Sequence, residues 1–224
     1  MATFSDSFAV FATVFAALFP VMNPLGSAPI FLSVAGKCSR PVQVKLARSV
    51  AINSFVLLFC SLMIGTTILN FFGVSLPALK LAGGAVIAVM GWGILNQDPS
   101  SSSGGGFASV DDNTASNSAF YPLTMPLVAG PGAIATMISL AAHYKSTPGF
   151  TFNDKVYVTI GYVAAIFALS VSIFLCFSQA DKLQRALGKN GTNVLMKLLG
   201  FILLAIGVQI ILGGWKEMMA PAAS

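Results

Sequence analysis

The chain has 224 residues, of which 56% are hydrophobic and 8% are charged, and its formal net charge is +5. Because a soluble domain has about 25% charged residues, twelve basic and seven acidic side chains could not cover a soluble fold of this size. Together with a mean hydropathy of +0.84, this composition excludes an ordinary soluble enzyme, a coiled coil, a disordered protein and a nucleic-acid-binding module.

Apolar stretches without charges predict six transmembrane helices. About 20 apolar residues cross a bilayer as a helix, and each stretch has 17 residues or more. The stretches are apolar on every face, whereas barrel strands alternate and are about half as long. We therefore expect an all-α membrane protein with spans at residues 8–34, 48–71, 77–97, 119–142, 155–178 and 194–214.

The basic residues predict the orientation in the membrane, because cytoplasmic loops carry an excess of Lys and Arg. The loops after the first, third and fifth spans hold seven basic residues, and the loops on the other side hold three. This favours both termini outside the cytoplasm and the Ser/Gly-rich connector 98–118 inside it, as a flexible loop. The seven are Lys37, Arg40, Lys45, Arg48, Lys182, Arg185 and Lys189.

An internal repeat relates residues 1–97 to residues 119–224, with the connector 98–118 between them. Pro20 aligns with Pro126, and Gly26 then falls on Gly132. A second match places residues 80–83 (KLAG) on residues 197–200 (KLLG). Each unit has three spans, so the two units must cross the membrane in opposite directions, as in many transporters. The alternative is a chance match of Gly and Pro in apolar sequence.

Both first spans of the repeat, 8–34 and 119–142, are interrupted by Gly and Pro. Pro24 and Pro131 cannot donate a backbone hydrogen bond, and Asn23 before Pro24 is pushed away from helical backbone angles. A break exposes N–H groups that attract a carboxylate and carbonyls that suit an ammonium group or a cation. Two such breaks suit a zwitterion, although a proline kink without function is the alternative.

The candidate substrate-binding residues lie at these two breaks, with one further polar residue inside the second span. Gly26 and Gly132 would let a solute approach the backbone closely, and Asn23 offers an amide donor and acceptor. The glycines of the third and sixth spans favour close helix packing instead. The full set is Asn23, Pro24, Gly26, Ser27, Ala129, Gly130, Pro131, Gly132, Ala133 and Asn53.

The motifs at residues 23–31 (NPLGSAPIF) and 126–134 (PLVAGPGAI) resemble the two signature motifs of the MarC family of integral membrane proteins. Residues 80–84 (KLAGG) resemble the start of its third helix, where Arg is usual, so a bidentate role at Lys80 is in doubt. The resemblance covers residues 8–214. An archaeal branch, SnatA, has the same layout, and it implies transport of small neutral amino acids such as glycine and alanine.

The remaining polar residues indicate no enzyme, metal or cofactor. All seven acids lie in loops or at span ends, so a proton relay through a buried carboxylate has no candidate. Lys80 and Lys197 fit anchors at the membrane interface better than a gate. We expect a secondary transporter of a small neutral amino acid or similar zwitterion in the inner membrane, with the coupling ion and the oligomeric state open. The alternative is a membrane scaffold or regulatory protein that does not transport.

Overall fold

The protein is helical throughout the part of the chain that the structure describes. A computed structural model describes residues 4–96, 109–112, 114–145 and 152–219. No strand occurs among these residues, so the predicted all-helical class is confirmed. The helices are α1 (Phe4–Met22), α2 (Pro24–Ala35), α3 (Arg40–Phe71), α4 (Leu76–Asn96), η2 (Ala115–Ser118), η3 (Ala119–Val128), α5 (Pro131–Lys145), α6 (Phe152–Ser178) and α7 (Ala180–Met219).

Five segments of the described chain are long and apolar enough to cross a membrane. They cover the predicted first, second, third, fifth and sixth spans, and they are Ser7–Ala35, Arg40–Phe71, Leu76–Asn96, Asp154–Ser178 and Gly191–Met219. The predicted fourth span, 119–142, does not form one helix of that length. Its apolar α-helical part is Pro131–Ala142, which at 1.5 Å per residue rises only about 18 Å.

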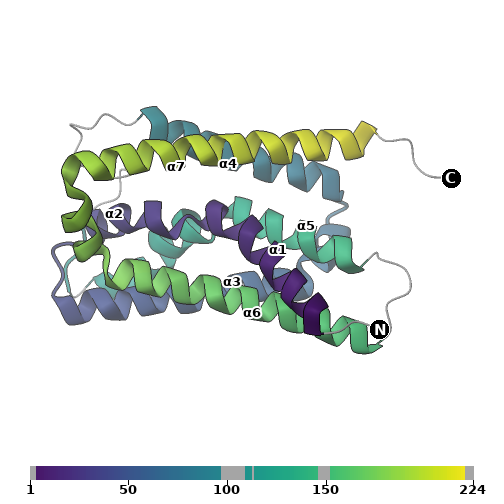
Figure 1. The fold of residues 1–224 in the computed structure, drawn as a ribbon, viewed down its shortest axis with the longest axis horizontal. Helices are drawn as coiled ribbons and strands as arrows, with labels where there is room; N and C mark the ends of the chain where they lie inside the picture. Colours follow the sequence, from purple (N-terminus) through teal and green to yellow (C-terminus); the bar gives the residue numbers. More distant parts are fainter. Residues whose placement is uncertain (1–3, 97–108, 113, 146–151, 220–224) are drawn as a thin grey trace.

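The helices form three layers (Figure 1). One outer layer is the pair α4 and α7, the other is the pair α3 and α6, and α1, α2 and α5 lie between them. The middle layer therefore holds helices from the two spans, 8–34 and 119–142, that the sequence predicted to be interrupted. In Figure 1, α1 begins and α7 ends at the right-hand end of the long axis, whereas α2 ends at the left.

Four glycines bring α4 and α7 into close contact. A Cβ atom on Gly84 would lie 2.8 Å from the carbonyl oxygen of Gly207, and one on Gly207 would lie 2.7 Å from that of Gly84. Gly91 and Gly200 approach each other in the same reciprocal way, at 2.7 and 3.1 Å. Residue numbers rise along one helix as they fall along the other, so the two helices are antiparallel. The expected close packing is thus confirmed at these positions, whereas Gly93 has no described neighbour within 4 Å of such a Cβ.

At the left-hand end of Figure 1, the described end of the predicted connector is bonded to the first half of the chain. Val110 donates its backbone N–H to Val34 O at 2.9 Å, and the Ser39 N–H donates to Asp112 Oδ1 at 2.8 Å. The bond from Ser39 holds the pKa of Asp112 below its ordinary value. Residues 97–108, most of the connector, lie outside the described residues.

An ion pair at the same end links the two halves of the chain. Arg40, at the start of α3, lies 3.2 Å from Asp181, near the start of α7. Both side chains are substantially exposed, at 47% and 35%. Arg40 also donates to the carbonyl oxygen of Ser178. The pair therefore joins chain segments that are distant in sequence but stays in contact with solvent.

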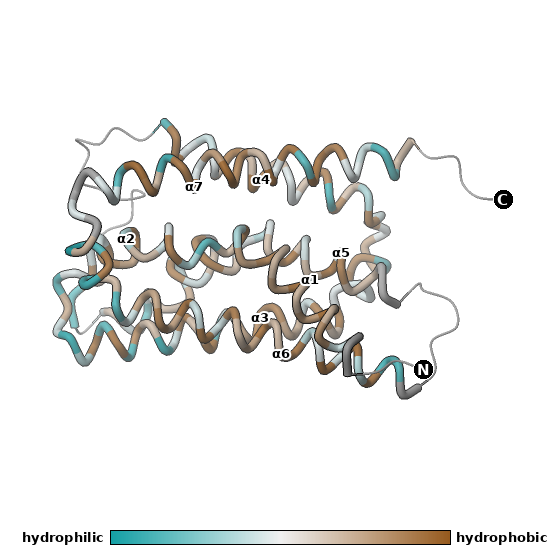
Figure 2. The backbone as a smooth tube through the Cα atoms, in the orientation of Figure 1, coloured by the Kyte–Doolittle hydropathy of each residue, from teal (hydrophilic) through white to brown (hydrophobic). Residues whose placement is uncertain are grey.

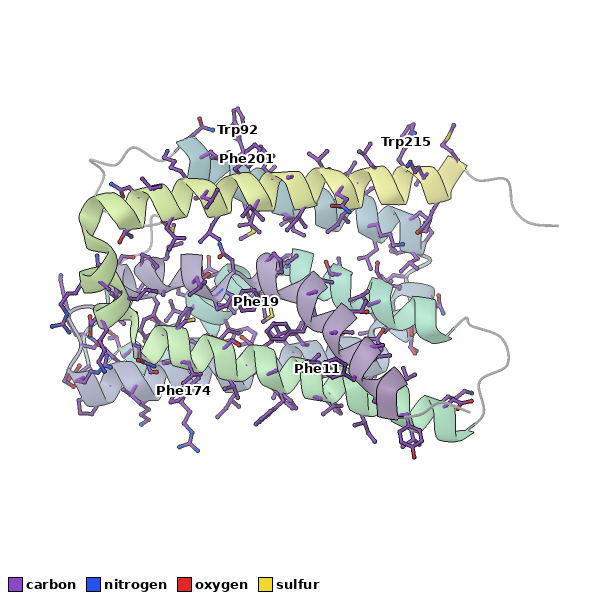
Figure 3. All side chains as sticks on the ribbon, viewed as in Figure 1. Phe11, Phe19, Trp92, Phe174, Phe201 and Trp215 are labelled. Carbon is purple, nitrogen blue, oxygen red and sulfur yellow. The ribbon has the colours of Figure 1, made fainter. Side chains whose placement is uncertain are left out.

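The outer surface of the helices is apolar, as lipid contact requires. Figure 2 shows hydrophobic residues along the helices and hydrophilic ones gathered mainly near their ends. Trp92, Phe201 and Trp215 point outward from the α4–α7 layer (Figure 3) and are 60%, 61% and 55% exposed. Soluble monomers rarely expose contiguous apolar surface of this kind. The surface therefore fits a bilayer and not water.

Candidate functional site

The first break, between α1 and α2, is one residue wide. Asn23 has left-handed backbone angles, φ 46° and ψ 58°, and its Oδ1 accepts a hydrogen bond of 3.1 Å from the Gly26 N–H. The backbone bonds Asn23 N–H to Phe19 O and Ser27 N–H to Asn23 O are both 2.9 Å long. Pro24 disfavours the right-handed helical conformation at Asn23, and Asn tolerates the left-handed one. Asn23 therefore ends one helix and caps the next.

The side chain of Asn23 occupies the space beside Gly26. A Cβ atom on Gly26 would lie 2.3 Å from Asn23 Nδ2 and 2.8 Å from Asn23 Oδ1. Asn23 is only 7% exposed, and Ser27 only 4%. In this conformation the Gly26 N–H already has an acceptor, so a solute would reach it only if the Asn23 side chain rotated away.

The second break is much wider than the first. Tyr121 and Met125, which precede Pro122 and Pro126, have the extended backbone angles φ −121°, ψ 124° and φ −118°, ψ 123°. The residue before a proline is driven toward this region, so η3 is not a regular helix. The Ala129 N–H reaches back five residues to Thr124 O at 2.9 Å. The chain resumes an α-helix only at Pro131.

Beyond the second break, α5 packs directly against α4. A Cβ atom on Gly132 would lie 2.3 Å from Ile87 Cγ1, and one on Gly83 would lie 2.5 Å from the Cβ of Ala135. Ala129 and Ala133 are buried, at 0% and 2% exposure. The glycine at 132 thus faces a side chain of α4 in this conformation.

The other predicted site residues are less tightly grouped. Pro24 and Gly130 are buried, whereas Pro131 is exposed. Asn53 is half-buried on α3, a helix that packs against η3, α5 and α6. The structure therefore places the residues of each break together, and Asn53 on a neighbouring helix.

A cavity of about 590 Å³ lies between α1, α4, α5 and α7, and so between both halves of the chain. Its volume falls within the range of about 300–1,000 Å³ that ligand pockets occupy. Four polar side chains lie in its wall: Lys80, Thr136, Ser139 and Gln209. The rest of the wall is apolar and includes Ala16, Ala17, Pro20, Gly83, Ala135, Leu140, Ile206, Ile210 and Gly213.

Two polar atoms of this wall have bonding capacity to spare. Ser139 Oγ is buried and has no hydrogen-bond partner among the described residues. Pro20 has no N–H, so the Ala16 carbonyl lacks the donor that a regular helix would give it. Thr136 Oγ1, in contrast, donates to the Gly132 carbonyl at 2.9 Å. Ser139 and Ala16, two residues of the wall, thus each have a polar atom without its usual partner.

The sequence did not reveal this cavity, although Pro20 and Lys80 of its wall stand in the predicted repeat. Lys80, which we expect to anchor its helix at the membrane interface, pairs with Glu217 near the end of α7. The Lys80 side chain is 22% exposed and that of Glu217 is 47% exposed. Thr136 and Ser139 share one face of α5 at a spacing of three residues, a signal that was present in the sequence.

These features define a multi-pass helical protein of the membrane. The chain matches the model of the MarC family integral membrane protein over residues 8–219, and it belongs to this family. It is 31% identical over 208 residues to the UPF0056 inner membrane protein MarC of Salmonella arizonae. The match covers 90% of this chain and 92% of that relative. The names of such relatives and the apolar helices identify it as an inner-membrane protein.

Two further relatives give the same result. The protein of the same name from Salmonella typhimurium is 30% identical, with 90% of this chain and 92% of the relative covered. The UPF0056 membrane protein of Buchnera aphidicola subsp. Schizaphis graminum is 28% identical over 213 residues, with 95% of each chain covered. No solved structure matches the chain.

Proposed function

We propose that the protein is a secondary transporter that moves a small neutral amino acid, or a similar zwitterion, by alternating access. The observation that carries the proposal is the arrangement of helix contacts, which repeats when the two halves are exchanged. Helix α1 packs on α6, and its counterpart η3 packs on α3. In the same way α2 packs on α6, and its counterpart α5 packs on α3. Likewise α4 packs on α5, and α7 packs on α2. This is the pattern expected of two inverted repeats.

The glycines between α4 and α7 support the same relation. Gly84 and Gly91 are separated by seven positions, as are Gly200 and Gly207. If Gly84 is matched with Gly200 and Gly91 with Gly207, exchanging the halves turns the contact of Gly84 with Gly207 into that of Gly200 with Gly91. This alignment of the two helices differs by one residue from the one that matches Lys80 with Lys197. Antiparallel packing of corresponding helices agrees with halves that cross the membrane in opposite directions.

The chemistry of the breaks favours a zwitterionic solute. The N-termini of α2 and α5 follow the two breaks, and a helix N-terminus attracts a carboxylate. Small residues at the breaks, such as Gly26, Ala129 and Gly132, would let a small solute approach the backbone closely. The resemblance to the SnatA branch adds glycine and alanine as the solutes to test first.

Uptake of labelled glycine and alanine into proteoliposomes tests the proposal. We expect accumulation above protein-free liposomes, and competition by an excess of the same unlabelled amino acid. The competing hypothesis, a scaffold or regulatory protein that kept the fold, predicts no uptake by monodisperse protein. Absence of both uptake and solute counterflow would favour that hypothesis.

We further propose that both termini lie outside the cytoplasm and that the connector lies inside. A single Cys placed at Ser102 in a variant lacking Cys38, Cys60 and Cys176 tests this orientation. We expect no labelling of intact cells by an impermeant thiol reagent, and labelling once the membrane is opened. Labelling of intact cells would reverse the orientation.

A further inference from the structure

The contacts of Lys80 and Glu217 give the cavity a chemistry that the interrupted helices do not have. Lys80 lies in the cavity wall, and its Nζ donates to Glu217 Oε1. Glu217 follows Gly213, another wall residue, by four positions on α7. Residues four apart lie on one face of a helix. Lys80 therefore connects the cavity wall to a carboxylate that lies beside the cavity and is not itself part of the lining.

We infer that this ion pair recognises a zwitterion, which binds by inserting between the two side chains. The inference rests on the proposed function and extends it to a particular site. The solute carboxylate takes the place of Glu217 on the Lys80 ammonium. The solute ammonium group then pairs with the released Glu217 carboxylate. One ion pair becomes two, and the net charge of the site stays the same.

Charge balance explains why a zwitterion fits this site better than a simple anion or cation. A carboxylate alone would take Lys80 and leave Glu217 without a partner, and an amine alone would do the reverse. Loss of the partner is costlier for Lys80, whose side chain is 22% exposed, than for Glu217, whose side chain is 47% exposed. Glu217 is about half exposed, so it can move outward as the solute enters.

The remaining polar atoms of the wall complete the site. The buried Ser139 Oγ lacks a partner among the described residues, and it can donate to a carboxylate or accept from an ammonium group. The Ala16 carbonyl, freed by Pro20, can accept from an ammonium group. Alanines and glycines make up much of the rest of the wall, so the side chain of the solute would contact mainly apolar groups.

Binding to the purified protein in nanodiscs tests the inference with three probes that share a carbon skeleton. Alanine carries both charges, propionate carries only the carboxylate, and alaninamide carries only the ammonium group. We expect alanine to bind most tightly. Lys80→Gln and Glu217→Gln should each weaken alanine binding about 10- to 100-fold, the effect of losing a hydrogen bond to a charged group.

Matched variants separate recognition from folding. Lys216→Gln removes a charge beside Glu217, at an exposed position, and should leave alanine binding unchanged. Lys80→Arg keeps the charge and should retain most of the affinity. Ser139→Ala should weaken binding less than Lys80→Gln does. Each variant is compared as monodisperse protein with an unchanged melting temperature, and Glu217→Gln decides the test if Lys80→Gln does not fold.

The outcomes distinguish this inference from the proposed function. If the wild type takes up alanine while Lys80→Gln and Glu217→Gln bind it normally, the site lies elsewhere and the transporter proposal stands. Equal affinity of the wild type for alanine, propionate and alaninamide would also overturn the insertion model. If the wild type neither binds nor transports glycine or alanine, both proposals fail for these solutes.

Discussion

The two helix breaks, which the proposed repeat places at corresponding positions, differ in width. At the first, Asn23 alone separates α1 from α2, and Ser7–Ala35 remains long enough to cross a membrane. At the second, backbone from Tyr121 to Ala129 departs from the regular α-helix, and a short helix follows. The repeat places Ala129 on Asn23. Because Ala129 has no side-chain acceptor, it cannot cap the following helix as Asn23 does.

The two breaks differ in width although prolines occur at the same spacing in both halves, at 20, 24 and 29 and at 122, 126 and 131. Pro20 and Pro29 lie inside helices, whereas the residues before Pro122 and Pro126 are extended. Proline spacing therefore does not determine how much backbone is unwound. The clearest local difference is the side chain of Asn23, which caps the helix that follows it.

The contact between α4 and α7, where the halves are most alike, should be the most sensitive to substitution. Gly84→Leu would place a side chain 2.8 Å from the Gly207 carbonyl oxygen. Overpacking typically costs about 1–3 kcal/mol, and we expect the upper end or more because the obstacle is backbone. Gly93→Leu, in the same helix but with nothing described within 4 Å, is the control. Equal melting temperatures of the two variants in detergent would contradict the packing described here.

Asn23→Ala removes the feature that makes the first break sharp. Loss of an N-cap costs about 0.5–2 kcal/mol, and a left-handed alanine adds about 1–2 kcal/mol. Asn23→Gly keeps the backbone conformation and should lose only a few tenths of a kcal/mol by the capping scale. Chemical denaturation in detergent measures both variants. A smaller loss for Ala than for Gly would show that the break does not depend on the left-handed conformation.

The same substitution tests the proposed site at the break. If Asn23 contacts the solute, Asn23→Ala should weaken solute affinity about 5- to 150-fold, which corresponds to about 1–3 kcal/mol of buried hydrogen bonding. Calorimetry on purified protein measures this change, with Asn53→Ala in α3 as a comparison. Unchanged affinity in Asn23→Ala and in Gly132→Val would leave the breaks as structural elements only.

Gly132→Ala tests the packing of the second half. Its Cβ would lie 2.3 Å from Ile87 Cγ1, and we expect destabilisation of about 1–2 kcal/mol because side chains can adjust more readily than backbone. Combining it with Ile87→Ala should cost less than the sum of the single changes, since the two residues touch. Gly213→Ala, which meets nothing described within 4 Å, should be neutral or stabilising. Additive effects of Gly132→Ala and Ile87→Ala would contradict the contact.

The smallest loss of stability is expected from breaking the solvent-exposed ion pair between the two halves of the chain. Asp181→Asn breaks the exposed ion pair with Arg40, and exposed pairs contribute about 0.2–1 kcal/mol. Arg40 keeps its bond to the Ser178 carbonyl, so we expect a loss near the lower end. A thermal melt at low and high salt measures it. A loss comparable to that of Gly84→Leu would show that the ion pair, and not the glycine contact, holds the halves together.

Much of the fold could be predicted because the spans are apolar and lack charges. The cores of α3, α4, α6 and α7 follow from this pattern, but α3 begins at Arg40 and α7 at Ala180, well before their apolar parts. These polar extensions pack on neighbouring segments. The hydropathy of each span, taken alone, gives no information about such contacts. A bend at Gly188, with φ 66°, separates the polar start of α7 from its apolar length.

The site was harder to predict than the fold. Asn23 and Pro24 identified the position of the first break, because their local backbone preferences are strong. The unwinding of η3 was missed although Pro122 and Pro126 are visible in the sequence. The contact of Gly132 with Ile87 and the cavity around Lys80 depend on how α4 packs against α5 and α7, and no local pattern specifies that packing.

The reciprocal glycine contacts between α4 and α7 have a consequence for how each half of the chain pairs. An interface in which residue i meets j and j meets i is self-complementary, as in a two-fold symmetric dimer. In the proposed repeat, Gly84 and Gly91 correspond to Gly200 and Gly207, so each half would carry the surface that the other half recognises. Under that proposal, the same contact would let a three-span unit pair with an inverted copy of itself.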